Sequence, residues 1–332
     1  MSKWPVSNER ANFHRRALVW DNHAGFEFDH RNDLSHVYRW RDAGVDYLSL
    51  NVGYDVKPWE LTISALSGYR AFVESDPERL MLVQTTRDID RARQAGKLAI
   101  GFDIEGMRAL NEDVSMVALY YRLGVRQMLI AYNLNNAAGG GCHDEDIGLT
   151  PFGRAVVEEM NRVGMVVDCS HSSYRSSMEA MEMSSAPVMF SHSNSRRLHD
   201  HQRNIKDDQI KACGATGGIV GITGIGMFLD PSGESVEALV RHIRYTADLI
   251  GPDKVGIGLD YDISDDFLED TVTANIHFWP KSQYPSGMNI GFLAPEAFPR
   301  ITSVLLDTGF SEDETLGILG VNFYRLAKNV WR

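Results

Sequence analysis

The sequence predicts a (β/α)8 barrel of the TIM type with inserted loops, formed by a single domain over residues 1–332. Short apolar runs typical of buried parallel strands recur along the chain, and helix-like segments separate most of them. The runs number eight, as a closed barrel of this type requires. Side chains able to do chemistry follow nearly every run, which indicates a functional face at the carboxyl ends of the strands.

The expected strands and helices alternate along the chain. Strands are predicted at 17–22, 46–52, 97–104, 125–132, 164–170, 187–191, 217–223 and 255–260. Helices between them are predicted at 58–75, 151–162, 173–183 and 235–250. A doubly wound open sheet is the competing fold, but no Gly-x-Gly-x-x-Gly sequence follows the first strand. That fold would also gather its functional side chains at one switch point, whereas here they follow nearly every strand.

Composition favours a compact enzyme with a small-molecule substrate. Hydrophobic residues make up 43% of the chain, which is ample for a large core. The formal net charge of −12 argues against nucleic acid or an anionic membrane surface as a partner. The N-terminus has no apolar signal segment, and no stretch approaches the roughly 18 apolar residues of a membrane span. The three cysteines are widely spaced without a Cys-x-x-Cys pair, which indicates reduced thiols and a cytoplasmic location.

Two successive predicted strands end in the same dipeptide, Ser-His. The histidines are His171 and His192, and each comes directly after a short apolar run. A histidine at such a position is either a hydrogen-bonded core residue or a ligand at the open face of the barrel. The repetition in neighbouring strands favours a shared metal site.

Nitrogen and oxygen donors follow other predicted strands. His23 comes after the first strand, Glu105 after the third and Asp260 at the end of the eighth. Imidazole and carboxylate donors without a suitably placed thiolate favour Zn²⁺ or another borderline divalent cation as Lewis acid and activator of water. Asp260 is suited to shuttle a proton beside such a water, although it could instead cap or pair at a strand end.

Two further segments are expected near the mouth of the barrel. Residues 265–299 follow the last strand, are long for a loop, and contain Trp279, Tyr284 and Phe292. We expect them to form one wall of the substrate pocket and to favour an apolar or ring-bearing group. The alternative is that they only cap the barrel. Residues 139–146 combine glycine with an acidic tip, and we expect a mobile loop over the mouth.

The chain resembles the membrane dipeptidase (renal dipeptidase) family of amidohydrolase-like metal barrels over nearly its whole length. The matching motifs lie at 148–171, 191–195, 203–208, 256–262 and 320–325. The resemblance implies a zinc-dependent hydrolase that cleaves the amide bond of a dipeptide or dipeptide-like molecule. It also implies tolerance of a D-residue at the C-terminal position in many members, and a homodimer.

The resemblance implies a role for each metal-site residue. His23 matches a ligand of the first metal, and Glu105 matches the carboxylate that bridges two metals. His171 and His192 match the two histidine ligands of the second metal. Asp260 matches the acid/base residue that acts on metal-activated water.

The same resemblance implies two substrate-binding residues, Arg203 and Asn133. Arg203 matches the residue that grips the terminal carboxylate of the substrate, a task that suits a guanidinium group. Without the resemblance, a surface arginine in a polar loop would be the preferred interpretation of this residue.

One departure from the family pattern concerns the first metal. Gly25 stands where the pattern has an aspartate ligand, so only His23 and Glu105 remain unless Glu27 or Asp29 substitutes. Three protein ligands are usual even in open catalytic zinc sites. We therefore expect one Zn²⁺ held by Glu105 and the two Ser-His histidines, with a weakened first site, so that one or two ions bind per chain.

A second departure concerns the residue that stabilises the developing oxyanion. Tyr132 stands where the family has a histidine, and its hydroxyl can donate one hydrogen bond. Either the chemistry is rebuilt around Tyr132 as a catalytic residue, or the substrate is not an ordinary dipeptide. The alternatives are an altered, mononuclear site acting on another amide, lactone or carbonyl substrate, and a catalytically silent binding protein.

Overall fold

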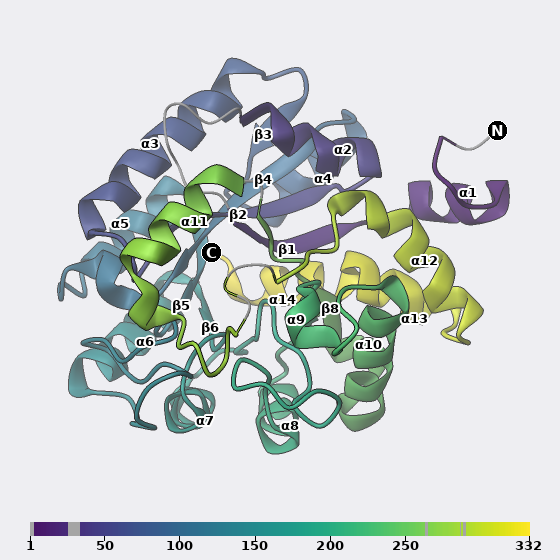
Figure 1. The fold of residues 1–332 in the computed structure, drawn as a ribbon. Helices are drawn as coiled ribbons and strands as arrows, with labels where there is room; N and C mark the ends of the chain where they lie inside the picture. The colour runs from purple at the N-terminus through teal and green to yellow at the C-terminus, as the bar shows by residue number, and fades with distance from the viewer. Residues whose placement is uncertain (1–2, 26–33, 263–264, 286, 288–289) are drawn as a thin grey trace.

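The chain forms a ring of parallel strands surrounded by helices (Figure 1). The computed structural model describes residues 3–25, 34–262, 265–285, 287 and 290–332, with the side chains of 265–269 excepted. The strands are β1 (Trp20–Gly25), β2 (Tyr47–Tyr54), β3 (Leu80–Leu82), β4 (Leu98–Glu105), β5 (Val125–Leu129), β6 (Val166–Asp168), β7 (Val220–Ile222), β8 (Val255–Ile257) and β9 (Tyr261–Asp262).

The pairing of these strands closes the ring. β1, β2, β4, β5 and β6 pair in parallel in that order, and β7 pairs in parallel with β8. Single parallel bridges, Asp168 to Met189 and Phe190 to Val220, join the two groups. β9 follows β8 directly and pairs with β1. The barrel predicted from the sequence is therefore confirmed, and β3 is an additional short strand that pairs with the first half of β4.

The sixth predicted strand, 187–191, is present only as those two bridges, so the prediction of a full strand there is wrong. Pro187 has no amide hydrogen to donate. The amide of Ser191 donates to the carboxylate of Asp168 rather than to a neighbouring backbone carbonyl. The backbone still occupies the expected place in the ring, which is what positions His192.

Helices cover the outside of the barrel. The four helices predicted at 58–75, 151–162, 173–183 and 235–250 are present with ends within one residue of the prediction. None of the helices in the described part of the chain combines the length and apolar character needed to cross a bilayer. The helices are α1 (Asn8–Arg16), α2 (Tyr38–Ala43), α3 (Trp59–Ser75), α4 (Thr86–Gln94), α5 (Met116–Leu123), α6 (Pro151–Val163), α7 (Tyr174–Met183), α8 (Asp207–Ala215), α9 (Gly226–Leu229), α10 (Val236–Ile250), α11 (Asp265–Ala274), α12 (Phe298–Asp307), α13 (Glu312–Leu316) and α14 (Asn322–Val330).

Helix α14 closes the amino end of the barrel. Phe323 of this helix packs with Trp20 and Tyr47. The centroids of the Trp20 and Tyr47 rings lie 3.8 Å apart. A side chain at Gly256 would begin 2.2 Å from the Phe323 ring, so only glycine allows this close approach. With this end filled by apolar side chains, the carboxyl ends of the strands form the open mouth.

Asp21 ties the closing strand to the rest of the barrel. Its carboxylate accepts hydrogen bonds from the Trp40 indole at 2.7 Å and from the Leu259 amide at 2.8 Å. The side chain is fully buried, and burial raises its pKa to about 7. Asp21 thus links β1 to α2 and to the segment between β8 and β9.

We predict that Asp21→Ala lowers the free energy of unfolding by roughly 2–4 kcal/mol, because the substitution leaves two buried donors without partners. Chemical denaturation followed by circular dichroism measures this change. Asp248→Ala is the control, since Asp248 is exposed on α10 and its loss should cost less than about 0.5 kcal/mol. Equal stability of the two variants would contradict a closing role for Asp21.

Candidate metal centre

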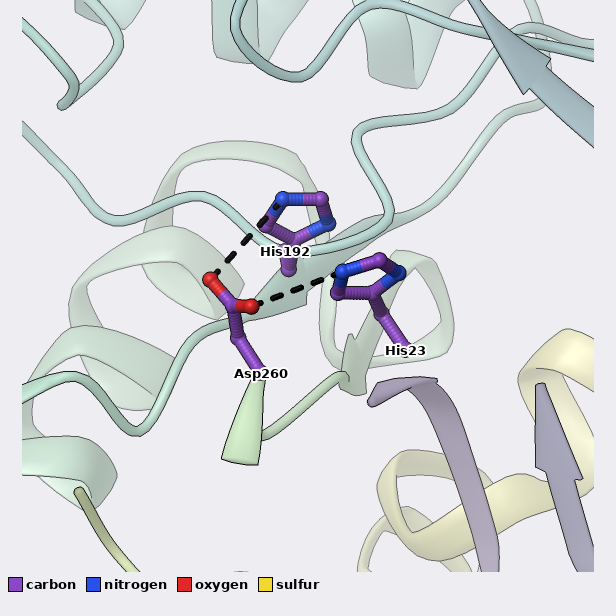
Figure 2. Close-up of side chains that lie close together, drawn as sticks. All are labelled: His23, His192 and Asp260. Carbon is purple, nitrogen blue, oxygen red and sulfur yellow. Dashed lines mark ion pairs between the residues drawn. The ribbon is translucent and has the colours of Figure 1, made fainter. Parts of the chain in front are cut away.

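Five potential ligands converge at the open end of the barrel. His23 belongs to β1 and Glu105 ends β4, while His171, His192 and Asp260 lie in the turns that follow their strands. The three histidines are buried, and the Asp260 carboxylate is 16% exposed. Figure 2 shows His23, His192 and Asp260 pointing toward one another.

Unusual backbone conformations direct two of these side chains into the mouth. His171 has a φ of 60° and Asp260 a φ of 59°, in the left-handed region that residues other than glycine rarely adopt. Asn133, four residues after the end of β5, has a φ of 59°. Such strained positions persist where the surrounding structure enforces them, and they gather at functional sites.

The Nε2 atoms of His171 and His192 form a compact triangle with Glu105. They lie 3.0 Å apart, and their distances to Glu105 Oε1 are 3.4 Å and 3.3 Å. In a tetrahedral zinc site with bonds of about 2.0–2.1 Å, two ligand atoms lie about 3.3 Å apart. The triangle therefore has the size of one face of such a site, and the residues present fit a divalent cation.

The opposite nitrogen of each imidazole is held by the protein. Nδ1 of His171 lies 2.7 Å from Asn133 Oδ1, so this nitrogen donates a proton and leaves Nε2 as an acceptor. Nδ1 of His192 lies 2.6 Å from Ser191 Oγ. Burial lowers the pKa of both histidines well below its ordinary value, so both rings are neutral. Neutral imidazoles oriented through Nδ1 are ready to bind a cation through Nε2.

His23 stands among carboxylates. Its Nδ1 lies 3.1 Å from Asp103, and its Nε2 lies 3.5 Å from Glu105 Oε1 and 3.4 Å from Asp260 Oδ1. Burial lowers the pKa of His23, but Asp103 and Glu105 more than offset this, so the pKa lies well above its ordinary value. Burial raises the pKa of Glu105 to about 8, against the opposing charge of His23. A cation bound at this cluster would displace the protons of its ligands, because metal ligands bind in their deprotonated form.

Asp103 is a supporting residue that follows from the third predicted strand but was not assigned to the site from the sequence. Its carboxylate accepts from Ser49 at 2.6 Å and from Asn51 at 3.1 Å while it holds His23. Asp103 and Glu105 are two residues apart in β4, so their side chains share the face that points into the barrel. The spacing of two residues between Asp103 and Glu105 was the signal in the sequence that could have identified Asp103 as a site residue.

Asp262 is a second missed residue. Gly25 and Asp262 are register partners in β1 and β9, and both line the pocket above the cluster. A side chain at Gly25 would begin 3.5 Å from Asp262 Oδ2. A carboxylate from β9 thus stands beside the position where the sequence pattern lacks one, and only the pairing of β9 with β1 reveals it. The substitutes proposed earlier, Glu27 and Asp29, lie outside the described residues.

Tyr132 and Asn133, in the segment after β5, lie on different sides of His171. The Tyr132 ring stacks on His171 with centroids 4.2 Å apart and faces the pocket. Burial raises the pKa of Tyr132 well above its ordinary value, so its hydroxyl is a donor. Asn133 is fully buried behind His171, and its amide donates to the Phe278 carbonyl at 3.1 Å. Its contacts orient His171, and a substrate in the mouth pocket would not reach it.

Arg203 is also used within the protein. Its terminal nitrogens donate to Ser193 Oγ at 3.0 Å and to the His192 carbonyl at 2.8 Å, and the residue is 2% exposed. Arg203 lines a polar pocket that shares His171 with the mouth pocket. The guanidinium Nε has no hydrogen-bond partner among the described residues, so this donor could bind the substrate carboxylate that the family resemblance implies. In the present conformation Arg203 supports the backbone of His192.

The segment after the last strand contributes to the pocket as predicted. Trp279, Tyr284, Ile290 and Phe292 line the mouth pocket beside the ligand cluster. The predicted loop at 139–146 also makes a backbone contact with the site. The Cys142 amide donates a hydrogen bond to the His171 carbonyl at 2.8 Å. The mobility expected for this loop stays a prediction.

The chain is similar in sequence to one protein family and to individual dipeptidases. The model of the membrane dipeptidase family (peptidase family M19) matches residues 55–275. Dipeptidase tcpJ of Claviceps purpurea is 30% identical over 274 residues, which cover 81% of this chain and 60% of the relative. Dipeptidase verJ of Clonostachys rogersoniana is 28% identical over 278 residues, or 81% of this chain and 65% of the relative. The matched region thus spans less than two thirds of either relative.

Solved structures agree over almost the whole chain. An amidohydrolase from Pseudomonas aeruginosa superposes with a TM-score of 0.88 at 27% identity, covering 97% of this chain and 99% of that one. A metallopeptidase from Rhodobacter sphaeroides, liganded with a phosphinate mimic of the dipeptide L-Ala-D-Ala, has a TM-score of 0.76 at 19% identity. It covers 95% of this chain and 99% of its own, which shows the shared fold.

We predict that Gly25→Asp raises the zinc content from about one ion per chain toward two, because a third protein ligand would complete the position beside His23. The measurement is elemental analysis of protein equilibrated with excess zinc and then freed of unbound ions. Two ions in the unaltered chain, falling to one in Asp262→Ala, would contradict this prediction. That result would mean that Asp262 already completes the position.

We also predict that Asn133→Ala weakens zinc binding about 10–100-fold, because His171 loses the group that fixes its orientation. Competition with a chromophoric chelator measures the affinity. Tyr132→Phe is the matched control, since it keeps the ring that stacks on His171 and should leave zinc affinity unchanged. An Asn133→Ala protein with normal affinity would contradict the orienting role.

Proposed function

Because this chain belongs to the membrane dipeptidase family, we propose that it is a zinc-dependent hydrolase that cleaves the amide bond of a dipeptide or dipeptide-like molecule. The observation that carries the proposal is the triangle of Glu105, His171 and His192, whose edges match a zinc site. The names of two relatives as dipeptidases support the substrate class, as does the dipeptide mimic bound to a structural neighbour.

We propose that Glu105, His171 and His192 hold one Zn²⁺. When bound, the ion supplies Lewis-acid polarisation of the scissile carbonyl and a lowered pKa for the attacking water. The histidines are suited to this task because their rings are neutral and their Nδ1 atoms are engaged. Glu105 adds the negative charge that keeps a divalent cation in a buried site.

Asp260 is the proposed acid/base residue. Its carboxylate lines the mouth pocket, and its backbone amide donates to the His23 carbonyl at 3.0 Å, which fixes the turn. From this position Asp260 takes a proton from the attacking water and delivers it to the leaving amine. Tyr132, next to His171, donates a hydrogen bond to the carbonyl oxygen as negative charge develops on it.

A second candidate is hydrolysis of another uncharged carbonyl compound, such as a cyclic amide or a lactone. One observation favours it: among the described residues that line the mouth pocket, none is lysine or arginine. A substrate with a free carboxylate would find no cationic side chain there. Substrates with free and blocked C-termini separate the two candidates, because only the first predicts cleavage of free dipeptides.

The test of the proposed function is hydrolysis of a panel of L,L- and L,D-dipeptides by the purified protein. We expect turnover with zinc, loss of turnover after chelation, and recovery when zinc is restored. Failure to cleave any dipeptide would contradict the proposal, as would cleavage that chelation does not affect.

We predict that Asp260→Asn lowers kcat about 10²–10⁴-fold while the protein keeps its zinc, because the variant preserves shape and removes the base. Tyr132→Phe should lower kcat less, since the carbonyl is still polarised. His171→Ala should lose the zinc itself, which elemental analysis detects. An active Asp260→Asn enzyme would exclude Asp260 as the acid/base residue, and a His171→Ala protein with normal zinc would exclude the proposed ligand set.

A further inference from the structure

We propose that the mouth pocket selects substrates whose N-terminal residue carries a large apolar or aromatic side chain. This inference rests on the proposed function, because it assigns the orientation and the specificity of a substrate at the same site. Three features of the pocket carry it: a continuous apolar wall beside the ligands, the fixed backbone of that wall, and the sign of the charges around it.

The apolar wall begins at a proposed metal ligand. Tyr132 stacks on His171 and meets Tyr54 and Trp279 edge to face, with centroid distances of 5.3 Å and 6.0 Å. The wall belongs to a hydrophobic cluster separate from the barrel core. A side chain next to the scissile bond would therefore lie directly against aromatic rings, which pack well on other rings. The apolar side chains that line the pocket are Tyr54, Tyr132, Ile225, Phe228, Trp279, Tyr284, Ile290 and Phe292.

The backbone of the wall is held in place. Ile225 and Phe292 form an antiparallel bridge, and the amide of Met227 donates to the Ile290 carbonyl at 2.9 Å. These contacts tie the segment after β7 to the segment that follows α11. A surface fixed in this way is formed before the substrate arrives, so little conformational entropy is lost on binding. The wall thus suits selection by shape and apolar contact.

The charged side chains that line the two pockets indicate the orientation in which a dipeptide binds. Three carboxyl side chains lie in the lining of the mouth pocket, and no lysine or arginine is among the described lining residues. Glu105 is a proposed zinc ligand and Asp260 the proposed acid/base residue, so Asp262 is the carboxylate that would face an ammonium group. The polar pocket on the other side of His171 has three basic side chains against two acidic ones, namely Arg196, Arg203 and Lys206 against Asp144 and Asp146. An ammonium group suits the mouth pocket, and a carboxylate suits the neighbouring one. The side chain that contacts the apolar wall therefore belongs to the residue with the free amine.

The test compares Phe-Gly with Ala-Gly, Asp-Gly and Gly-Phe as substrates of the zinc-loaded protein. We expect kcat/KM for Phe-Gly to exceed that for Ala-Gly about 10–100-fold, because a benzyl group leaves water for an apolar surface. Asp-Gly and Gly-Phe should be poorer than Phe-Gly by at least about tenfold. Equal values for Phe-Gly and Ala-Gly would overturn the inference, and a preference for Gly-Phe would overturn the assigned orientation.

Phe292→Ala should reduce the preference for Phe-Gly over Ala-Gly to a few-fold, because kcat/KM falls more for Phe-Gly than for Ala-Gly. Phe292 is partly exposed at the edge of the wall, so its truncation does not empty the core. Phe72→Ala is the matched control, since Phe72 is a partly exposed phenylalanine on α3 outside the pocket. A preference that survives Phe292→Ala, or that falls equally in Phe72→Ala, would overturn the role of the wall.

A binding measurement separates this inference from the proposed function. Calorimetry with zinc-loaded protein compares 3-phenylpropionohydroxamic acid with acetohydroxamic acid, which share the metal-binding group and differ by the benzyl group. We expect about 10–100-fold tighter binding of the phenyl compound, lost in Phe292→Ala. This result would stand even if no dipeptide were cleaved, in which case only the proposed function fails. Equal affinities would overturn the inference while leaving dipeptide hydrolysis intact.

Discussion

The site depends on one buried carboxylate. Glu105 Oε1 lies within 3.5 Å of Nε2 of His23, His171 and His192, although these histidines come from distant parts of the chain. Burial raises the pKa of this carboxyl group to about 8, and the barrel brings the strand ends together around it. In the proposed zinc site, a cation held by Glu105 would therefore also lie against the surrounding imidazoles.

The rest of the structure serves to keep these atoms in place. Asp103, Asn133 and Ser191 hold the outer nitrogens of the three histidines. The left-handed turns at His171 and Asp260 direct the side chains inward, a conformation that costs energy and that hydrogen bonds on both sides maintain. Helix α14 fills the amino end of the barrel, so that the mouth is the end at which substrate meets the cluster.

The sequence predicts those features that depend on the periodicity of a single segment. Buried runs such as 97–104 and 125–132 predict strands, and the parallel alternation of strands and helices then places His171 beside His192. Features that depend on contacts between distant segments were not predictable. The hydrogen bonds that engage Arg203, the position of Asn133 behind its histidine, and the carboxylate of Asp262 beside Gly25 all require knowledge of which strand ends are neighbours. The incomplete strand at 187–191 has the same origin, because the Ser191 amide donates its hydrogen bond to the side chain of Asp168 in a neighbouring strand.

The measurement that tests the central claim most directly is anomalous X-ray scattering at the zinc edge from crystals of the zinc-loaded protein. The structure predicts a strong peak about 2.0–2.1 Å from Nε2 of His171, from Nε2 of His192 and from a carboxylate oxygen of Glu105. A peak elsewhere in the molecule, or no peak at this cluster under excess zinc, would contradict the account of the site.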